Sequence, residues 1–261
     1  MVLAVEEVTL EFEGLRALSG VSFGVEQGAL VALVGPNGAG KTSLLNCVSG
    51  FHAPTRGRVR FEGVTISGQP PHRVAAHGVA RIFQFVELFR HMTVLDNILL
   101  GRHRHMRTGV LAGSLFWGRS RREEARARRR VEEVIEFLEL ERYRTEPIAN
   151  LPFGVQKLVG VGRALAMEPK LLLLDEPSTG MNREEKENLA RFLLRIKHEL
   201  GTTMLWIEHD MELVGDLAER VVVLDFGQKI AEGLSDSVLR DPRVAEAYLG
   251  RGYEGQKGPQ R

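Results

Sequence analysis

The sequence of 261 residues contains a single cysteine, Cys47, and therefore no pair of cysteines that could form a disulfide bond within the chain. We expect Cys47 to be a small buried apolar side chain on a helix. No uninterrupted apolar run approaches the ~18 residues that a membrane-spanning helix needs. The first residues, Met1 to Glu7, contain no basic group of the kind that begins a secretory signal. We therefore expect a soluble, cytoplasmic protein that is at most peripheral to a membrane.

The chain also has almost no net charge, because 35 Lys and Arg residues face 34 Asp and Glu residues and leave a formal charge of +1. This balance argues for neither nucleic acid nor acidic lipid as a partner of the chain as a whole, since both attract strongly basic proteins. Apolar residues make up 43% of the sequence, which is enough for a large core in one or two compact units.

One glycine-rich stretch stands between an expected strand, Leu30 to Val34, and an expected helix, Ser43 to Val48. Its Gly-x-x-x-x-Gly-Lys-Thr pattern is that of a P-loop, in which glycines let backbone N–H groups surround an anion at a helix N-terminus. The lysine can reach the outer phosphates of a nucleotide, and the threonine hydroxyl can bind Mg²⁺. The expected nucleotide-binding residues are Gly35, Pro36, Asn37, Gly38, Ala39, Gly40, Lys41, Thr42 and Ser43.

A second expected strand ends in two carboxylates. Leu171 to Leu174 is a continuous apolar run, typical of a central parallel strand that is covered on both faces, and Asp175 and Glu176 follow it. The first acid can hold Mg²⁺ or its water molecules. The second can polarise the water that attacks a γ-phosphate.

Three further candidates have alternatives that the sequence leaves open. Gln84 ends the expected strand from Val79 and could bind Mg²⁺ or hold the attacking water, or be a solvated loop residue. His209 follows the expected strand from Thr202 to Ile207 and could contact the γ-phosphate, or lie in an ordinary turn. Phe12 could stack on adenine, or be a core or edge-strand residue.

The middle of the chain, from about Thr93 to Gly162, loses the strand pattern and is expected to be helical. Its clearest helix, Arg121 to Leu140, has apolar residues on one face and several arginines in its early half. The preceding stretch, Val110 to Trp117, is apolar and flanked by arginines. These residues could lie near a membrane surface or a membrane partner, or form a solvated helix face with a loop packed on it.

The remaining pattern predicts short antiparallel strands within Val8 to Val25, a strand from Gly57 to Gly63 and a hairpin from Val221 to Gly233. Asn182 and Glu185 form a capping-box pattern ahead of a helix. The buried stripe of that helix is expected to comprise Leu189, Phe192, Leu193, Ile196 and Leu200.

Taken in order, these motifs resemble the ATP-binding-cassette (ABC) ATPases over about residues 3 to 249. The Leu-Pro-Phe-Gly-Val-Gln stretch stands where the signature of that family usually has Leu-Ser-Gly-Gly-Gln, a motif that other P-loop ATPases lack. The signature, which in this family contacts the nucleotide of a second subunit, comprises Leu151, Pro152, Phe153, Gly154, Val155 and Gln156. The D-loop comprises Ser178, Thr179, Gly180, Met181 and Asn182.

This sequence departs from the family pattern at three positions. Pro152 replaces the usual signature serine and removes a hydroxyl that could contact the opposite nucleotide. Val155 replaces a glutamine, although Gln156 follows, and Asn182 replaces the usual D-loop aspartate. Gly154 is retained, and its backbone N–H at a helix start is the group needed for phosphate. We therefore expect an active site rather than a degenerate one.

The resemblance implies an α/β fold with a P-loop NTPase core, an antiparallel β subdomain and an inserted α-helical subdomain. It implies one domain over residues 1–249, with the core at about 1–87 and 163–235, the helical subdomain at about 88–162, C-terminal helices at about 236–249, and a flexible tail at 250–261. The implied cofactors are ATP and Mg²⁺. Thr42, Gln84 and Asp175 would serve the metal, Glu176 would activate water, and His209 would sense the γ-phosphate.

A closer resemblance is to the ATPase subunits of bacterial importers for branched-chain amino acids, and of related urea and amide importers. It is carried by Gly78 to Gln84, Met92 to Asn97, the Leu-Pro-Phe-Gly signature, Asp241 to Val244 and Tyr248-Leu249-Gly250. It implies ATP hydrolysis that drives import and does not identify the solute.

The resemblance also implies partners. These are a second ATPase subunit, identical or not, and integral membrane permease subunits, with a solute-binding protein as an indirect partner. Their place would be the cytoplasmic face of the inner membrane. The stretch from Phe85 to Phe89 is expected to receive a helix of the membrane subunit, with core aromatic residues as the alternative.

Rival classes of ABC protein fit the sequence less well. DNA-repair and chromosome-type members have long coiled coils, whereas no sustained heptad run occurs in this sequence. Translation-type members carry two cassettes per chain, and this chain has one. The presence of Lys41 and Glu176 disfavours a binding module with an inactive site.

Overall fold

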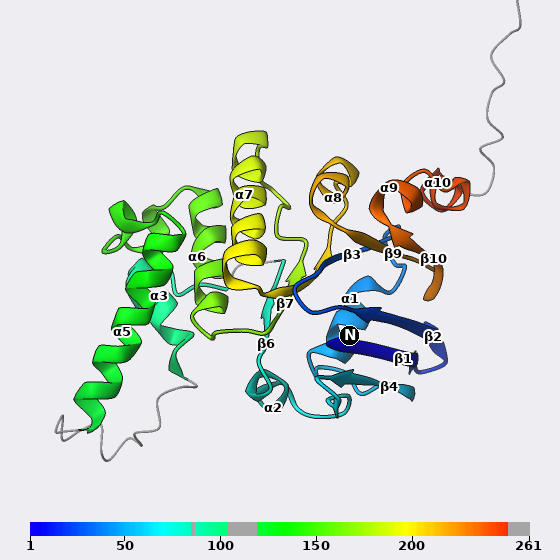
Figure 1. The fold of residues 1–261 in the computed structure, drawn as a ribbon, viewed down its shortest axis with the longest axis horizontal. Helices are drawn as coiled ribbons and strands as arrows, with labels where there is room; N and C mark the ends of the chain where they lie inside the picture. The colour runs from blue at the N-terminus through cyan, green and yellow to red at the C-terminus, as the bar shows by residue number, and fades with distance from the viewer. Residues whose placement is uncertain (85–86, 104–118, 250–261) are drawn as a thin grey trace, which may run out of the picture. The chain divides into compact units, whose positions relative to one another are not determined.

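In a computed structural model, the protein is described over residues 1–84, 87–103 and 119–249 (Figure 1). The chain divides into two compact units. Unit 1 consists of Met1–Gly68 and Trp206–Arg261, and unit 2 consists of Gln69–Leu205. The chain passes from unit 2 to unit 1 within strand β8 (Thr203–Ile207).

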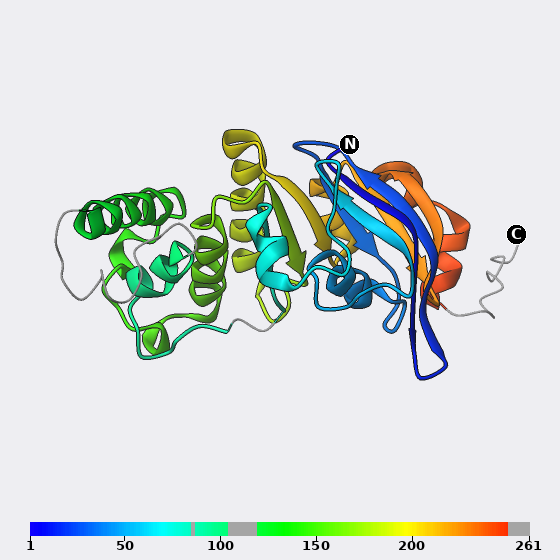
Figure 2. The same ribbon diagram turned by 90° about the horizontal axis from the view of Figure 1, so that it is seen from below.

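The N-terminal part of unit 1 is an antiparallel sheet with strand order β2-β1-β4-β5. Its strands are β1 (Leu3–Phe12), β2 (Leu15–Val25), β4 (Arg56–Phe61) and β5 (Val64–Thr65). The antiparallel strands predicted within Val8 to Val25 are confirmed, but they are not short, since β1 and β2 form one long hairpin (Figure 2). Register irregularities between Val5 and Glu11 interrupt the alternation of apolar and polar residues, which is why the sequence suggested several pieces.

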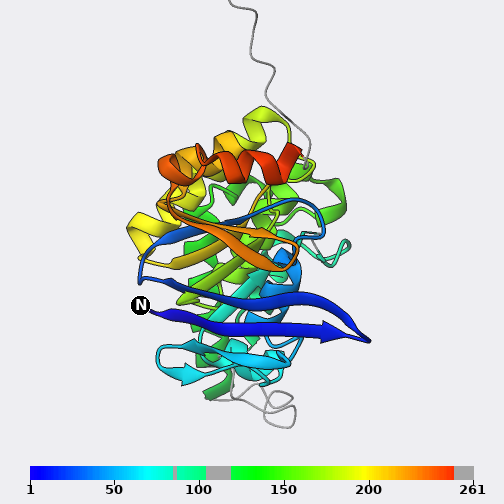
Figure 3. The same cartoon turned by 90° about the vertical axis from the view of Figure 1, so that its right-hand side faces the viewer.

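The C-terminal part of unit 1 surrounds strand β3 (Leu30–Val34), all five residues of which are buried. Strand β9 (Arg220–Asp225) pairs in parallel with β3 and antiparallel with β10 (Gln228–Leu234), so the predicted closing hairpin is confirmed. The helices are α1 (Lys41–Val48), α8 (Met211–Leu217), α9 (Ser235–Val238) and α10 (Pro242–Leu249). Figure 3 shows α9 and α10 alongside the β9–β10 hairpin. Cys47 is buried as expected, and burial raises the pKa of its thiol to about 11.

Unit 2 contains the parallel strands β6 (Val79–Ile82) and β7 (Leu171–Asp175). Its helices are α2 (Pro71–Ala76), α3 (Val94–Leu100), α5 (Arg119–Phe137), α6 (Phe153–Leu165) and α7 (Arg183–Leu200), with the 3-10 turns η2 (Glu141–Tyr143) and η3 (Ile148–Asn150). Helix α3 packs against α5 and α6 (Figure 1). Among the described helices, none combines the length and the apolar composition required to cross a bilayer.

Arg126 and Arg129, on the basic face of helix α5, are exposed. Arg128 pairs with Glu124, and Arg130 pairs with Glu168. These contacts are those of a solvated face. The apolar stretch from residue 110 to residue 117, for which a membrane-proximal position was the alternative, lies outside the described residues.

Helix α7 begins with the predicted capping box, since Asn182 and Glu185 each accept a hydrogen bond from the other's backbone N–H. Its buried stripe agrees with the sequence from Leu189 to Ile196. The prediction that Leu200 continues this stripe was wrong, because Leu200 is 52% exposed. It is the last residue before the left-handed Gly201, where the helix ends and the turn leads the chain into β8.

Candidate functional site

In unit 1, the predicted P-loop connects β3 to α1, and its backbone geometry depends on glycine. Gly35 has a φ of 146° and a Cβ atom there would lie 2.0 Å from the carbonyl oxygen of Leu224. Gly40, with a φ of 97°, leads directly into α1. The first turn of α1 contains no acidic residue and no side-chain cap, so its N–H groups are suited to an external anion.

The lysine of the loop is held by the loop itself. Nζ of Lys41 donates hydrogen bonds to the carbonyl oxygens of Gly35, at 2.7 Å, and Pro36, at 2.9 Å. The side chain is therefore folded back over the loop, and Lys41 is 6% exposed. Asn37, Gly38 and Thr42 are exposed. The ammonium group, the glycine-rich backbone and a hydroxyl thus occur together in one segment.

Two other candidates belong to unit 1. Phe12, at the end of β1, is 41% exposed, and its ring meets that of His52 edge to face with 5.1 Å between centroids. Part of this aromatic surface is accessible, so Phe12 is not the core residue that the sequence left open.

His209 follows β8, where its backbone N–H and that of Asp210 donate to the carboxylate of Glu208, at 2.8 and 3.3 Å. Asp210 in turn caps helix α8. Glu208 is 2% exposed, and the sequence analysis did not select it. Its position directly before His209 at a strand end was the available signal. It anchors the turn that presents the histidine.

In unit 2, the two acids at the end of β7 have different partners. Asp175 Oδ2 accepts a hydrogen bond from Arg81 Nη2 at 2.6 Å, and the two side chains are only 7% and 6% exposed. Arg81 comes from the neighbouring strand β6, where its Cα pairs with that of Leu173. This arginine was not selected from the sequence, because an arginine inside a short strand carries no local signal of its partner.

Glu176 contacts the predicted glutamine. Nε2 of Gln84 donates to Oε2 of Glu176 at 2.7 Å, so the two candidate residues lie together. The backbone of Glu176 has a φ of 47°, in the left-handed region that residues other than glycine rarely adopt.

The signature stretch begins helix α6, and Gly154 lies in the first turn, as the sequence predicted. The helix has no side-chain cap at Pro152. Instead, the backbone N–H of Gly154 donates to Oε1 of Glu185 at 2.9 Å, while Oε2 of Glu185 accepts the backbone N–H of Asn182. One carboxylate therefore joins the signature to the D-loop.

Further contacts in and beside the signature hold this part of unit 2 together. The carbonyl of Gln84 accepts a hydrogen bond at 2.7 Å from Nζ of Lys157, a residue of α6 that is 3% exposed. The side chain of Gln156 donates to the carbonyl of Leu151. Phe153 is 47% exposed, and Gly180 of the D-loop lies close to its ring. Lys157, like Glu185, was missed as a connecting residue.

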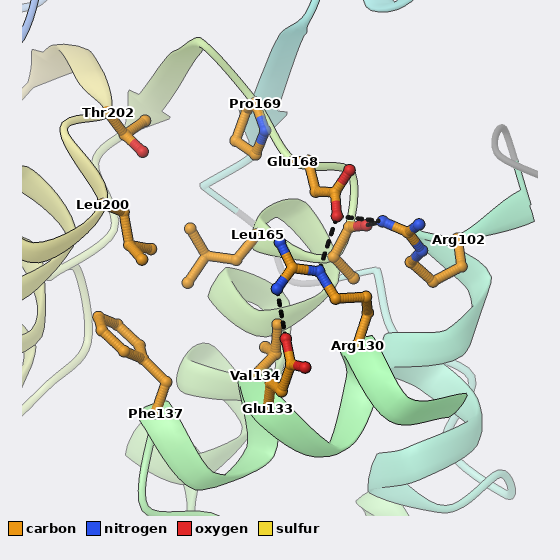
Figure 4. Close-up of a pocket in the computed structure, with 11 residues that line it drawn as sticks. Arg102, Arg130, Glu133, Val134, Phe137, Leu165, Glu168, Pro169, Leu200 and Thr202 are labelled. Atoms are coloured by element: carbon orange, nitrogen blue, oxygen red, sulfur yellow. Dashed lines mark hydrogen bonds and ion pairs between the residues drawn. The ribbon is translucent and has the colours of Figure 1, made fainter. Parts of the chain in front are cut away.

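A cavity of about 420 Å³ in unit 2 lies apart from these motifs (Figure 4). Its polar lining consists largely of two arginines and two glutamates that pair with one another. Arg130 contacts both Glu133 and Glu168, and Arg102 contacts Glu168. Because these charges already neutralise each other and none of the predicted site residues lines the cavity, we do not assign it to the nucleotide site.

The predicted residues therefore gather within each unit. Unit 1 carries the P-loop, Phe12 and His209, and unit 2 carries the signature, the D-loop and the group formed by Gln84, Asp175 and Glu176. Phe85 lies outside the described residues, and Phe89 is 57% exposed.

Comparison with known proteins identifies the family. A family described as "ABC transporter" matches residues 18–179, and one described as "Branched-chain amino acid ATP-binding cassette transporter" matches residues 228–254. The chain is 38% identical over 249 residues to the high-affinity branched-chain amino acid transport ATP-binding protein BraF of Pseudomonas aeruginosa, covering 95% of this chain and 98% of that protein. It is 36% identical over 248 residues to LivG of Escherichia coli, a protein of the same description, covering 95% and 97% of the two chains.

Solved structures agree. A nucleotide-free ATP-binding cassette from an ABC transporter superimposes with a TM-score of 0.83 at 32% identity, covering 95% of this chain and 99% of that one. The ADP conformation of such a cassette gives a TM-score of 0.83 at 33% identity, covering 95% and 98%. The fold predicted from the sequence is thereby confirmed, and the chain belongs to the ABC transporter family as an ATP-binding cassette.

Proposed function

We propose that this chain is the ATP-hydrolysing subunit of a membrane importer for branched-chain amino acids. The observation that carries the catalytic part is the Glu176–Gln84 pair at the end of the buried strand β7. A carboxylate in this position can polarise the attacking water, and the amide of Gln84 holds the carboxylate in place.

The P-loop provides the binding half of the reaction. Lys41 and the loop amides would hold the phosphates, helped by the uncapped N-terminus of α1. Lys41 would exchange its two carbonyl partners for phosphate oxygens, which are stronger acceptors because they are charged. Phe12 would stack on adenine, and His209 would sense the γ-phosphate.

The residues assigned to Mg²⁺ suit that ion by their chemistry. Thr42, Gln84 and Asp175 all offer oxygen donors, which Mg²⁺ prefers, although Oδ2 of Asp175 would have to exchange its bond to Arg81 for the ion. Because the amide nitrogen of Gln84 is turned to Glu176, its amide oxygen is the end that remains for a cation. When bound, Mg²⁺ would neutralise charge on the phosphates.

One P-loop and one signature per chain favour a dimer, in which the signature of each subunit meets the ATP held by the other. The group that would face the γ-phosphate is the N–H of Gly154 at the start of α6, which would exchange its acceptor on Glu185 for a phosphate oxygen. The remaining partners would be permease subunits and, through them, a solute-binding protein at the cytoplasmic face of the inner membrane. The descriptions of BraF and LivG favour branched-chain amino acids as the solute.

The test compares Glu176→Gln with the wild type and with Glu187→Gln, an exposed carboxylate that pairs with Arg183. Glu176→Gln keeps an acceptor for Gln84 but loses the charge, so phosphate release with Mg²⁺ should fall about 10²- to 10⁴-fold. It should accumulate as a dimer in size-exclusion chromatography with Mg-free ATP, while Glu187→Gln behaves as wild type. Hydrolysis by Glu176→Gln at the wild-type rate would refute the assignment.

The solute is tested separately. The chain would be co-expressed with its permease subunits in membrane vesicles, with solute-binding protein and ATP supplied. Uptake of labelled leucine would be compared with uptake of labelled urea. ATP-dependent uptake of urea without leucine would redirect the proposal to the related importers.

A further inference from the structure

Strand β9 and the chain that follows it reach the P-loop at three points, all within unit 1. Gly227, in the β9–β10 turn, donates its backbone N–H to the carbonyl of Ala39 at 3.0 Å. The carbonyl of Leu224 lies so close to Gly35 that no Cβ atom would fit there. The third point is a side chain from the last helix: the hydroxyl of Tyr248, on α10, accepts the backbone N–H of Gly35 at 2.7 Å.

Gly35 links this tyrosine to the lysine of the P-loop. Its N–H donates to Tyr248, and its carbonyl accepts from Nζ of Lys41 at 2.7 Å. A glycine at a φ of 146° has no side chain to restrain it, so hydrogen bonds on either side determine its orientation. The hydroxyl of Tyr248 is therefore two hydrogen bonds away from the ammonium group that would bind phosphate.

The chemistry of the hydroxyl suits a place beside an anion site. Burial raises the pKa of the Tyr248 phenol above its ordinary value, while the N–H of Gly35 lowers it to a smaller extent. The group is consequently neutral at physiological pH. A neutral acceptor satisfies the amide without repelling a polyphosphate, which a carboxylate in the same place would do.

Packing alone does not explain the residue. Val244, one turn earlier on α10, is 4% exposed and already anchors the helix, whereas Tyr248 is 38% exposed. A phenylalanine would provide the same apolar contact. What the tyrosine adds is the acceptor for Gly35.

We propose that Tyr248 is a positioning residue for the P-loop: the C-terminal helix α10 holds Gly35, and through it Lys41, in the arrangement that binds ATP. The inference rests on the proposed ATP-binding function of this loop. It assigns a role to Tyr248, the first residue of the Tyr-Leu-Gly stretch in the sequence resemblance, which the hydrolysis steps do not use.

The test compares Tyr248→Phe with Tyr143→Phe, a matched variant at a tyrosine of unit 2. Titration with ATP in the absence of Mg²⁺ gives Kd, and phosphate release with Mg²⁺ gives KM and kcat. For Tyr248→Phe we expect Kd and KM to rise about five- to tenfold with kcat within about twofold of wild type, because one hydrogen bond to the ground-state loop is lost. Tyr143→Phe should leave all three values unchanged. A merely structural role would lower the melting temperature and leave KM unchanged.

A second measurement does not depend on ATP binding. Hydrogen exchange of the amides in the P-loop, followed without nucleotide by mass spectrometry, should be faster in Tyr248→Phe than in the wild type and Tyr143→Phe. Unchanged exchange would overturn the positioning role, and so would an unchanged Kd in a protein that binds ATP. If the wild type does not bind ATP, but its P-loop amides still exchange more slowly than those of Tyr248→Phe, the proposed function is refuted and the positioning role is not.

Discussion

The two units stabilise their functional groups in opposite ways. In unit 1 the central charge is a cation, Lys41, and two backbone carbonyls of the same loop accept hydrogen bonds from it. In unit 2 the central charges are carboxylates, and their partners are side chains and amides from other elements: Arg81 for Asp175, Gln84 for Glu176 and the Gly154 amide for Glu185.

The difference indicates how each unit would respond to a nucleotide. The carbonyl groups that accept from Lys41 are uncharged and belong to the same loop. Charged phosphate oxygens can therefore replace them at little cost in free energy. The carboxylates of unit 2 are locked into pairs between elements far apart in the chain. Removing a partner there should affect stability, whereas removing Lys41 should affect chemistry.

The largest effect is expected in unit 1. Lys41→Ala removes the charge that would pair with the outer phosphates, and turnover should fall about 10³-fold, as for the loss of a key electrostatic contact in other enzymes. Phosphate release measures it, with urea unfolding as a check that stability changes little. Lys229→Ala, whose ammonium pairs with Glu232 in the same unit, is the control. Wild-type turnover by Lys41→Ala would show that the P-loop assignment is wrong.

A smaller effect, on stability rather than on turnover, is expected for Arg81→Met in unit 2. It leaves the carboxylate of Asp175 buried without its guanidinium partner, which should lower the free energy of unfolding by about 3 kcal/mol. Urea unfolding followed by circular dichroism measures this. Arg183→Met, which breaks an exposed pair with Glu187, should change it by less than about 1 kcal/mol. Equal effects of the two variants would contradict the distinction between buried and exposed pairs.

The smallest effect is expected for Glu185→Gln, which weakens both the capping box of α7 and the bond to Gly154. Hydrogen bonds to a charged acceptor are stronger than those to a neutral one, so stability should fall by about 1 kcal/mol. The same unfolding experiment applies, with the neighbouring Glu184→Gln as control and an expected change within about 0.5 kcal/mol. If Glu185→Gln and Glu184→Gln change the free energy of unfolding equally, the bonds of Glu185 to the signature and the D-loop do not contribute to stability.

The elements that the sequence predicted well are those with local causes. The P-loop needs only a strand, its glycines and the Lys-Thr pair that follows, and the capping box of α7 needs only Asn182 and Glu185, three residues apart. The β1–β2 hairpin was predicted less well, because irregular pairing hides its alternation.

The contacts that the sequence could not supply join residues far apart along the chain. Arg81 and Asp175 are separated by 94 positions, Lys157 and Gln84 by 73, and Tyr248 and Gly35 by 213. An arginine in a short strand or a tyrosine in a terminal helix has many possible partners until the chain is folded.

By itself, the sequence determined the class of chemistry, because the P-loop, the Asp175-Glu176 strand end and the signature are runs of neighbouring residues whose spacing suits phosphate and metal. Only the tertiary structure shows which distant groups contact these motifs: Arg81 contacts Asp175, Glu185 accepts the Gly154 amide, and Tyr248 accepts the Gly35 amide. The physical reason is that hydrogen bonds and ion pairs act over about 3 Å in space, whatever the distance along the chain.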